Sequence, residues 1–373
     1  MTSFRLTRSD KSVLGRWWWT VDHWILAALA LLIGYGVILI QAATPAIATH
    51  YGLDPFYFTQ RHVAGLIPAV ALMLGVSLLT PRQALWGAAG LLAVTLPLLA
   101  ATLVLGAEVK GATRWLDLFG VSLQPSEFVK PALIVVAAWL FARQQERPQG
   151  YAWALNAVLY GAVVVGLLGQ PDLGMTVLVS CVWFGQFFLA GMSVRAAGGV
   201  AFAGAAGLVG AYYVFPHVTA RVDRFLGHGD TYQTDRALEA FAHGGVWGVG
   251  PGEGTVKLTL PDAHADFVMA VAGEELGLIG CLLIVGLFAF IAVRGLGRLR
   301  QENNLFILLA SAGLLISFGL QALINMSSTL HIIPAKGMTL PFVSYGRSSL
   351  WATGLGMGLL LAFTRKRYGL SGL

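Results

Sequence analysis

Three charged residues, Lys130 and the adjacent Glu274 and Glu275, lie inside long apolar stretches of the 373-residue chain. A charge at the centre of a membrane helix costs about 2.5–3.5 kcal/mol on insertion scales, so such residues are candidates for function. Glu127 precedes Lys130 by one helical turn. We expect Glu127, Lys130 and Glu274 to satisfy one another around an outward-facing cavity and to bind substrate there. The alternative is a structural ion pair that only fixes helix packing.

A second candidate site is the run Lys110-Gly111-Ala112-Thr113-Arg114-Trp115. The two cations suit the negative charge of a sugar phosphate, and the indole of Trp115 suits the face of a sugar ring. The alternative is anchoring at the membrane surface, where Trp and Arg are common. Further candidates for binding such a substrate are Arg61, Lys257 and Lys336.

The segment 260–267 reads Leu-Pro-Asp-Ala-His-Ala-Asp-Phe and places Asp266 at the start of an apolar stretch. A carboxylate between water and lipid can act as a general base with an adjustable pKa, and we assign that catalytic role to Asp266. Capping of the following helix is compatible with it. His264 is a substrate-binding candidate. The pair does not predict a zinc site, because no third and fourth ligands follow at a typical spacing.

Two further segments are unusual for loops. Six glycines occur within 244–254, and their backbone N–H groups could bind phosphate, although no nucleotide-binding motif accompanies them. Residues 330–349 are too apolar for a solvated loop and too broken for a helix. Irregular backbone at membrane depth is tolerated where it is buried or lines a cavity, so we expect this segment to present Lys336 and Arg347 to a cavity.

The elements that must position these residues are apolar. Hydrophobic residues make up 57% of the chain and charged residues 11%, against about 25% charged residues in an average soluble domain. A spanning helix needs about 20 apolar residues. The predicted spans are 23–44, 61–79, 83–106, 127–142, 151–168, 173–190, 196–215, 267–293, 304–325 and 348–364. The predicted fold is an all-α integral membrane protein of about ten spanning helices, without a soluble domain.

Basic residues predict the orientation. With the N-terminus inside, 14 of the 24 Lys and Arg residues fall on short inner segments, as the positive-inside rule requires. Both termini are then cytoplasmic, and the tails 1–22 and 365–373 flank a single membrane domain, 23–364. Its longest connection, 216–266, is a large periplasmic loop between the seventh and eighth spans. Topology accounts for the net charge of +6, so no nucleic-acid binding is expected.

These motifs resemble the SEDS family of cell-wall polymerases, and within it the FtsW type rather than the RodA type. The similarity extends over about 20–365. The matching motifs are Lys110–Trp115, Gln124–Glu127, Gln170–Gly174, Leu260–Phe267 and Pro334–Pro341. The opening Trp17–Asp22 resembles alphaproteobacterial members of the family.

The resemblance implies a ten-helix protein of the bacterial inner membrane at the division septum. It implies a peptidoglycan glycosyltransferase that polymerises lipid II at the outer face, with Asp266 as the essential acid and with Glu127, Lys130 and Glu274 lining the same cavity. The implied partners are a class B penicillin-binding transpeptidase and other cell-division proteins. A divalent cation, Mg²⁺ or Mn²⁺, could share the charge of the substrate's diphosphate, but no motif assigns ligands to it.

Two other functions stay open at this point. A transporter that flips lipid II would also place polar residues between helices, and a scaffold could recruit the transpeptidase without catalysis. The clustering of all candidates in the outer half favours the enzyme, because a transporter needs polar groups near the inner face as well.

The chain departs from the family pattern most clearly at Arg347, where the family has Gly. This residue adds a side chain and a charge at a tight place. Smaller departures occur at Met175, His243, Asp262 and Ala265.

Overall fold

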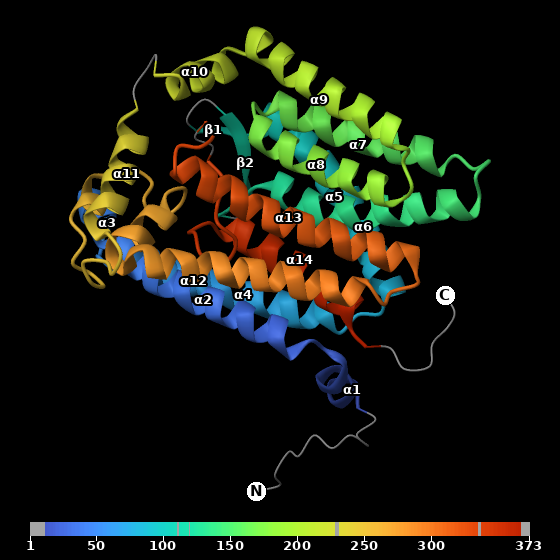
Figure 1. Cartoon of the computed structure of the whole chain (residues 1–373), viewed down its shortest axis with the longest axis horizontal. Coiled ribbons are helices and arrows are strands. Elements are labelled where there is room, and N and C mark those ends of the chain that lie inside the picture. The colour runs from blue at the N-terminus through green and yellow to red at the C-terminus, as the bar shows by residue number, and fades with distance from the viewer. Residues whose placement is uncertain (1–11, 110–111, 119, 228–230, 335–336, 367–373) are drawn as a thin grey trace, which may run out of the picture.

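The computed structural model describes residues 12–109, 112–118, 120–227, 231–334 and 337–366, and it is a bundle of long helices that run side by side (Figure 1). Each of the ten predicted spans coincides with a helix. These are α2 (His23–Ala43), α4 (Tyr57–Ser77), α5 (Pro81–Leu105), α6 (Pro125–Glu146), α7 (Ala152–Gly169), α8 (Leu173–Leu189), α9 (Val194–Val214), α12 (Val268–Leu299), α13 (Leu305–Thr329) and α14 (Arg347–Thr364).

Among the described helices, seven are long and apolar enough to cross a membrane by length and composition, and α8 is a shorter apolar helix. The other two, α4 and α14, begin with polar turns that carry Arg61 and Arg347. The chain is therefore a multi-span helical membrane protein, as its composition predicts. The charged residues of α4 and α14 lie near the starts of these helices, where Arg61 and Arg347 are found.

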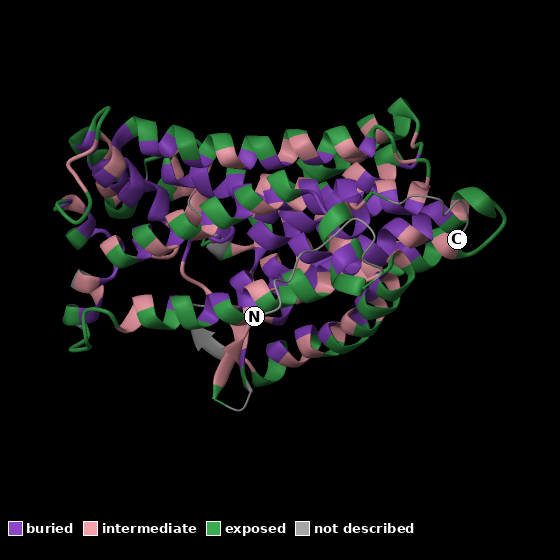
Figure 2. Cartoon of the chain, turned by 90° about the horizontal axis from the view of Figure 1, so that it is seen from below, coloured by how far each residue is buried: buried purple, intermediate pink, exposed green. Residues whose placement is uncertain are grey.

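Burial divides the bundle into a centre and a rim. Nearly all of α6 and most of α13 are buried, whereas Ala211 is the one buried residue among the described side chains of α9. Figure 2 shows the buried residues gathered in the middle of the bundle, with exposed residues on the outer helices. A helix that is apolar on all sides can lie at the centre of the bundle, where protein surrounds it, or at the rim, where lipid does.

A cluster of charged residues lies at one end of the bundle, where the first and last described residues of the chain also lie. The Asp22 carboxylate caps α2 and forms ion pairs with Arg294, at 3.0 Å, and Arg298, at 2.6 Å, on α12. The short helix α1 (Val13–Thr20) precedes it, and the Lys366 amide donates to the Thr20 carbonyl at 3.0 Å. Both described ends thus lie on one side, as an even number of spans requires.

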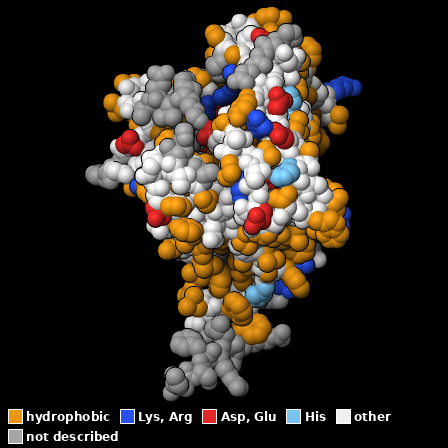
Figure 3. Space-filling view, turned by 90° about the vertical axis from the view of Figure 1, so that its left-hand side faces the viewer, with side chains coloured by type: hydrophobic (Ala, Val, Ile, Leu, Met, Phe, Trp, Pro, Cys, Tyr) orange, Lys and Arg blue, Asp and Glu red, His pale blue; other side chains and the backbone are white. Residues whose placement is uncertain are grey.

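The opposite end carries the short elements. A three-stranded antiparallel sheet, which the sequence analysis does not predict, consists of β1 (Ala107–Val109), β2 (Ala112–Leu118) and β3 (Val121–Leu123). The predicted loop 216–266 contains α10 (Pro216–Phe225), α11 (Tyr232–Gly244) and the 3₁₀ turn η1 (Val256–Thr259), and α3 (Pro45–His50) lies at the same end (Figure 1). In the end-on view, charged and His side chains gather on this end, while hydrophobic side chains cover the flank (Figure 3).

The orientation of the bundle in the membrane is testable with reporter fusions. We expect a fusion at Gly150, in the connection between α6 and α7, to behave as cytoplasmic. A fusion at Gly227, which follows α10, should behave as periplasmic, because the basic residues concentrate at the opposite end. Alkaline phosphatase activity that is high at Gly150 and absent at Gly227 would contradict this orientation.

Candidate active site

Asp266 lies where the loop before α12 meets the loop between α13 and α14. The buried Asn325 amide of α13 donates to the Asp266 carbonyl at 2.9 Å and to the Met338 carbonyl at 2.7 Å. Gly337 packs against the carboxylate, since a Cβ at this position would lie 3.1 Å from Asp266 Oδ2. Asn325 therefore holds the backbone of the half-buried Asp266 beside the 337–346 loop, at the end of the bundle opposite the described termini.

The predicted capping role of Asp266 is not observed. Phe267 is the N-cap residue of α12, and no side chain caps this helix. The amide of Asp266 instead donates to the Asp262 carbonyl at 3.1 Å, within a turn that Asp262 enters with φ 55°. The turn places Asp266 one residue before the N-cap position of α12.

His264 joins three parts of the chain. Its carbonyl accepts the Tyr345 amide at 2.9 Å, and its ring lies 5.2 Å from the ring of Tyr345 and 5.3 Å from the ring of Phe58. One turn further along α4, the exposed guanidinium of Arg61 lies 4.6 Å from the Tyr57 ring. The structure thus brings Arg61 and His264 to the same aromatic cluster beside the Asp266 loop. Their contact with substrate stays a prediction.

The ion pair predicted for Lys130 is present, and its partner is Glu127 at 2.7 Å. Lys130 also donates to Gln321 Oε1 at 2.7 Å, and Gln321 donates to the Thr339 carbonyl at 3.1 Å. The chain of contacts continues from Thr339 to Ser349 at 2.6 Å. It connects α6, α13 and α14 through the 337–346 loop and borders a hollow with about 380 Å³ of empty space.

We expect Lys130→Met to reduce turnover much more than the amount of folded protein. Methionine keeps the length and apolarity of the stem but removes the charge, which leaves Gln321 and Glu127 without their shared partner. Membrane insertion favours the uncharged side chain. Turnover of labelled lipid II per mole of purified protein measures the effect, and equal elution profiles establish folding. Full activity of the variant would show that the pair has only a packing role.

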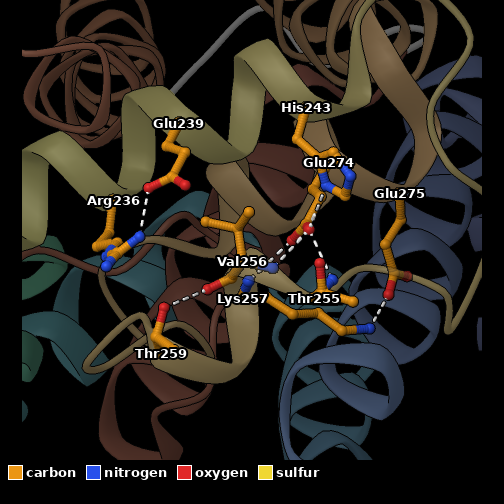
Figure 4. Close-up of polar contacts among 9 residues, drawn as sticks. All are labelled: Arg236, Glu239, His243, Thr255, Val256, Lys257, Thr259, Glu274 and Glu275. Carbon is orange, nitrogen blue, oxygen red and sulfur yellow. Dashed lines mark hydrogen bonds and ion pairs between the residues drawn. The ribbon is translucent and has the colours of Figure 1, made fainter.

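Glu274 does not join Lys130, which corrects the expected three-residue network. It is fully buried near the start of α12, and its carboxylate accepts the backbone N–H groups of Thr255, Val256 and Lys257 at 2.7–2.8 Å (Figure 4). His243 Nδ1 lies 2.9 Å from the same carboxylate. All these partners belong to the segment that leads into α12, so Glu274 anchors this segment and is not positioned to contact substrate.

The glycine-rich stretch packs closely against α12. A Cβ at Gly244 or Gly248 would collide with the backbone of α12, and Gly248 has φ 82°. The helix itself breaks at Gly277, with φ 66°, where the stretch docks. The N–H of Val249 donates to the Glu274 carbonyl at 2.9 Å and that of Gly250 to the Glu275 carbonyl at 3.1 Å. These two donors are directed at protein carbonyls and bind the stretch to α12.

Lys257 has a structural partner in the same region. Its ammonium group is buried and pairs with the buried carboxylate of Glu275 (Figure 4). Separating a buried ion pair leaves an uncompensated charge, which is strongly unfavourable. Lys257 therefore has a structural role here, which corrects its prediction as a substrate-binding cation. Glu274 and Glu275 each make a separate contact that anchors the segment before α12.

Arg114 and Trp115 lie on β2, above the start of α8. Arg114 donates to the Pro171 carbonyl at 2.9 Å and lies 3.4 Å from the carboxylate of Asp172. Asp172 also caps α8 by accepting the Met175 amide at 3.2 Å. Trp115 is half-buried. The substrate-binding candidates Lys110 and Lys336 lie outside the described residues.

Gln321 and Asn325 of α13 were not predicted from the sequence. Gln321 binds Lys130, and Asn325 binds the backbone of Asp266 and Met338. The two residues are four apart, so they lie on one face of the helix. Thr329 continues this face and donates to the Asp266 carbonyl at 3.4 Å. Polar residues that recur every four positions within an apolar span could have indicated this face from the sequence.

No metal-binding cluster is found in the described part of the chain, where no group of three or more His, Cys, Asp or Glu side chains could hold an ion.

The bundle of apolar helices and the polar site among the loops at one end define a polytopic membrane protein. The chain belongs to the FtsW, RodA and SpoVE family, whose model is described as a cell cycle protein and matches residues 22–369.

Curated relatives and solved structures agree with this assignment. The chain is 44% identical to a probable peptidoglycan glycosyltransferase FtsW of Caulobacter vibrioides, over 98% of this chain and 95% of that protein. It is 38% identical to the same type of protein from Alkalilimnicola ehrlichii, over 96% and 92%. A structure from a peptidoglycan synthase complex that coordinates polymerization and crosslinking matches with a TM-score of 0.76 and 28% identity, over 92% and 97%. RodA of Thermus thermophilus matches with a TM-score of 0.67 and 27% identity, over 92% and 96%.

Proposed function

We propose that the chain is a peptidoglycan glycosyltransferase that polymerises lipid II into glycan strands at the outer face of the inner membrane during cell division. The observation that carries the proposal is the position of Asp266: Asn325 holds its backbone carbonyl, Gly337 packs against its carboxylate, and the surrounding loops contain Arg and His side chains. Relatives with 44% and 38% identity bear the name of this activity.

The chemistry follows from the groups at this end. The described chain contains no nucleotide-binding domain, so the activated donor is a sugar on a lipid diphosphate. A sugar hydroxyl of the acceptor attacks the anomeric carbon of the donor, and a new glycosidic bond forms. The bond between that carbon and the phosphate oxygen breaks, and the lipid diphosphate leaves with the electron pair. Asp266 accepts the proton of the attacking hydroxyl.

Positive charge at the outer end serves the leaving diphosphate. Arg114 and Arg61 are the described members of the predicted set that reach this end of the bundle, and Lys130 lies deeper, bound to Glu127. Donors aimed at developing charge contribute most where water is excluded. The proposal includes a divalent cation, Mg²⁺ or Mn²⁺, as a companion of the diphosphate, which chelation with EDTA during turnover tests.

The proposal extends to a class B penicillin-binding transpeptidase as partner, to other division proteins, to cytoplasmic termini and to a location at the division septum. A structural relative comes from a complex in which polymerization and crosslinking are coordinated, which supports the partner. Co-purification of the chain with the transpeptidase from the same organism tests it.

The proposed function is tested with purified protein and labelled lipid II in detergent, with and without the transpeptidase partner. We expect glycan chains that a muramidase degrades. The rival function is transport of lipid II across the membrane, for which a liposome accessibility assay is the readout. Movement of lipid II without polymer under any condition would replace the enzyme by the transporter.

A further inference from the structure

A pocket with about 760 Å³ of empty space lies at the outer end, where α10, the start of α11 and two loops meet. Its lining includes Arg221 and Arg224 of α10, Tyr232 of α11, Pro261 from the loop that precedes Asp266, and His331 from the segment after α13.

The helix α10 directs two guanidinium groups to this pocket. Arg221 and Arg224 are three residues apart and therefore neighbours on one face of the helix. Neither of them takes part in an ion pair with another residue of the described chain. Asp223, which lies between them, accepts a hydrogen bond from the Tyr212 hydroxyl at 2.9 Å. Arg221 and Arg224 thus line the pocket, while the acid between them in the sequence, Asp223, is bound to Tyr212.

Charged groups of the candidate site act on Arg221. Burial lowers the pKa of the Arg221 guanidinium, and the positive charges of Arg114 and Arg224 act in the same direction. The carboxylates of Asp172 and Asp266 act in the opposite direction. Arg221 therefore lies within electrostatic range of Asp266, and two positive and two negative groups act on it.

We propose that this pocket binds the diphosphate of a lipid-linked substrate through Arg221 and Arg224. The inference rests on the proposed function and deepens it, because it assigns the anionic group of the substrate to named residues. Two guanidinium groups one turn apart suit two adjacent phosphates, since each guanidinium can donate two parallel hydrogen bonds to phosphate oxygens. Arg221 and Arg224 also supply the positive charge that Lys257 and the glycine-rich stretch do not.

The test is a binding measurement that does not depend on turnover. Full-length protein in a neutral detergent is titrated with undecaprenyl diphosphate, and with undecaprenol as the uncharged control. We expect Arg224→Gln to raise the apparent Kd for the diphosphate about tenfold or more, and Arg221→Gln with Arg224→Gln to raise it further. Arg236→Gln is the matched control, because Arg236 lies on α11 and pairs with Glu239 at the surface. Its Kd should stay within about twofold of wild type.

Folding is checked by elution profile and melting temperature. Arg224 is exposed, so its single variant decides the question if the double variant does not fold. An unchanged Kd in Arg224→Gln would overturn the proposal. Phosphatidylglycerol is the second source of phosphate, and competition by it as strong as by undecaprenyl diphosphate would overturn the assignment to substrate.

The two proposals fail in different ways. If wild type polymerises lipid II while binding does not depend on the two arginines, the pocket assignment alone is wrong. If binding depends on the arginines but wild type does not polymerise, the pocket stands and the proposed function is wrong.

Discussion

Asp266→Asn is expected to lower the rate of lipid II polymerisation by about 10²–10⁴-fold, which is the usual contribution of a positioned general base. Asparagine has nearly the same shape as aspartate but cannot accept the proton of the attacking hydroxyl. Asn325, Thr329 and Asp262 bind the backbone of Asp266, so these three contacts survive the change. The measurement is the initial rate of polymer formation by purified protein with its transpeptidase partner.

Asp262→Asn is the matched control for this variant. Asp262 lies in the same loop and has φ 55°, a conformation that Asn tolerates as well as Asp does. We expect this control to keep a rate within about threefold of wild type, since changes away from special features usually have small effects. An Asp266→Asn protein that polymerises as fast as the control would remove Asp266 from the catalytic role.

Glu274→Ala has the second-largest expected effect, and it is on stability. The change leaves three backbone N–H groups without an acceptor, and each unsatisfied buried donor costs about 1–3 kcal/mol. We expect a loss of about 3 kcal/mol or more in the free energy of unfolding. Denaturation in mixed micelles, followed by tryptophan fluorescence, measures it.

Glu239→Ala removes an equivalent carboxylate from the surface of α11, where it pairs with the exposed Arg236. We expect this control to change the free energy of unfolding by less than about 1 kcal/mol. If Glu274→Ala is as stable as the control but has a raised KM for lipid II, Glu274 contacts substrate and the anchoring role is wrong.

The spans were predictable because each leaves a local signal. A stretch of about 20 apolar residues is read directly from the sequence, and all ten predicted stretches are helices. The ion pair of Glu127 with Lys130 was predictable for the same reason, since residues three apart meet on a helix. The strands of the outer sheet have three to seven residues, which is too short for a reliable periodic pattern.

The partners of the other charged residues were not predictable, because tertiary docking decides them. Glu274 meets backbone N–H groups 17 to 19 residues earlier in the chain, and this depends on how the glycine-rich stretch packs at the break of α12. Lys130 meets Gln321 across 191 residues. The arginines of α10 became candidates only when the fold placed them around a pocket near Asp266.

The central claim is that this chain polymerises lipid II at its outer end, and oriented proteoliposomes test it most directly. Labelled lipid II is supplied only to the leaflet that the 216–266 loop faces, and polymer is separated by gel electrophoresis. The account predicts glycan chains from wild type in this arrangement and none when lipid II is confined to the opposite leaflet. Polymer formed from the opposite leaflet alone, or transfer of lipid II between leaflets without any polymer, would contradict it.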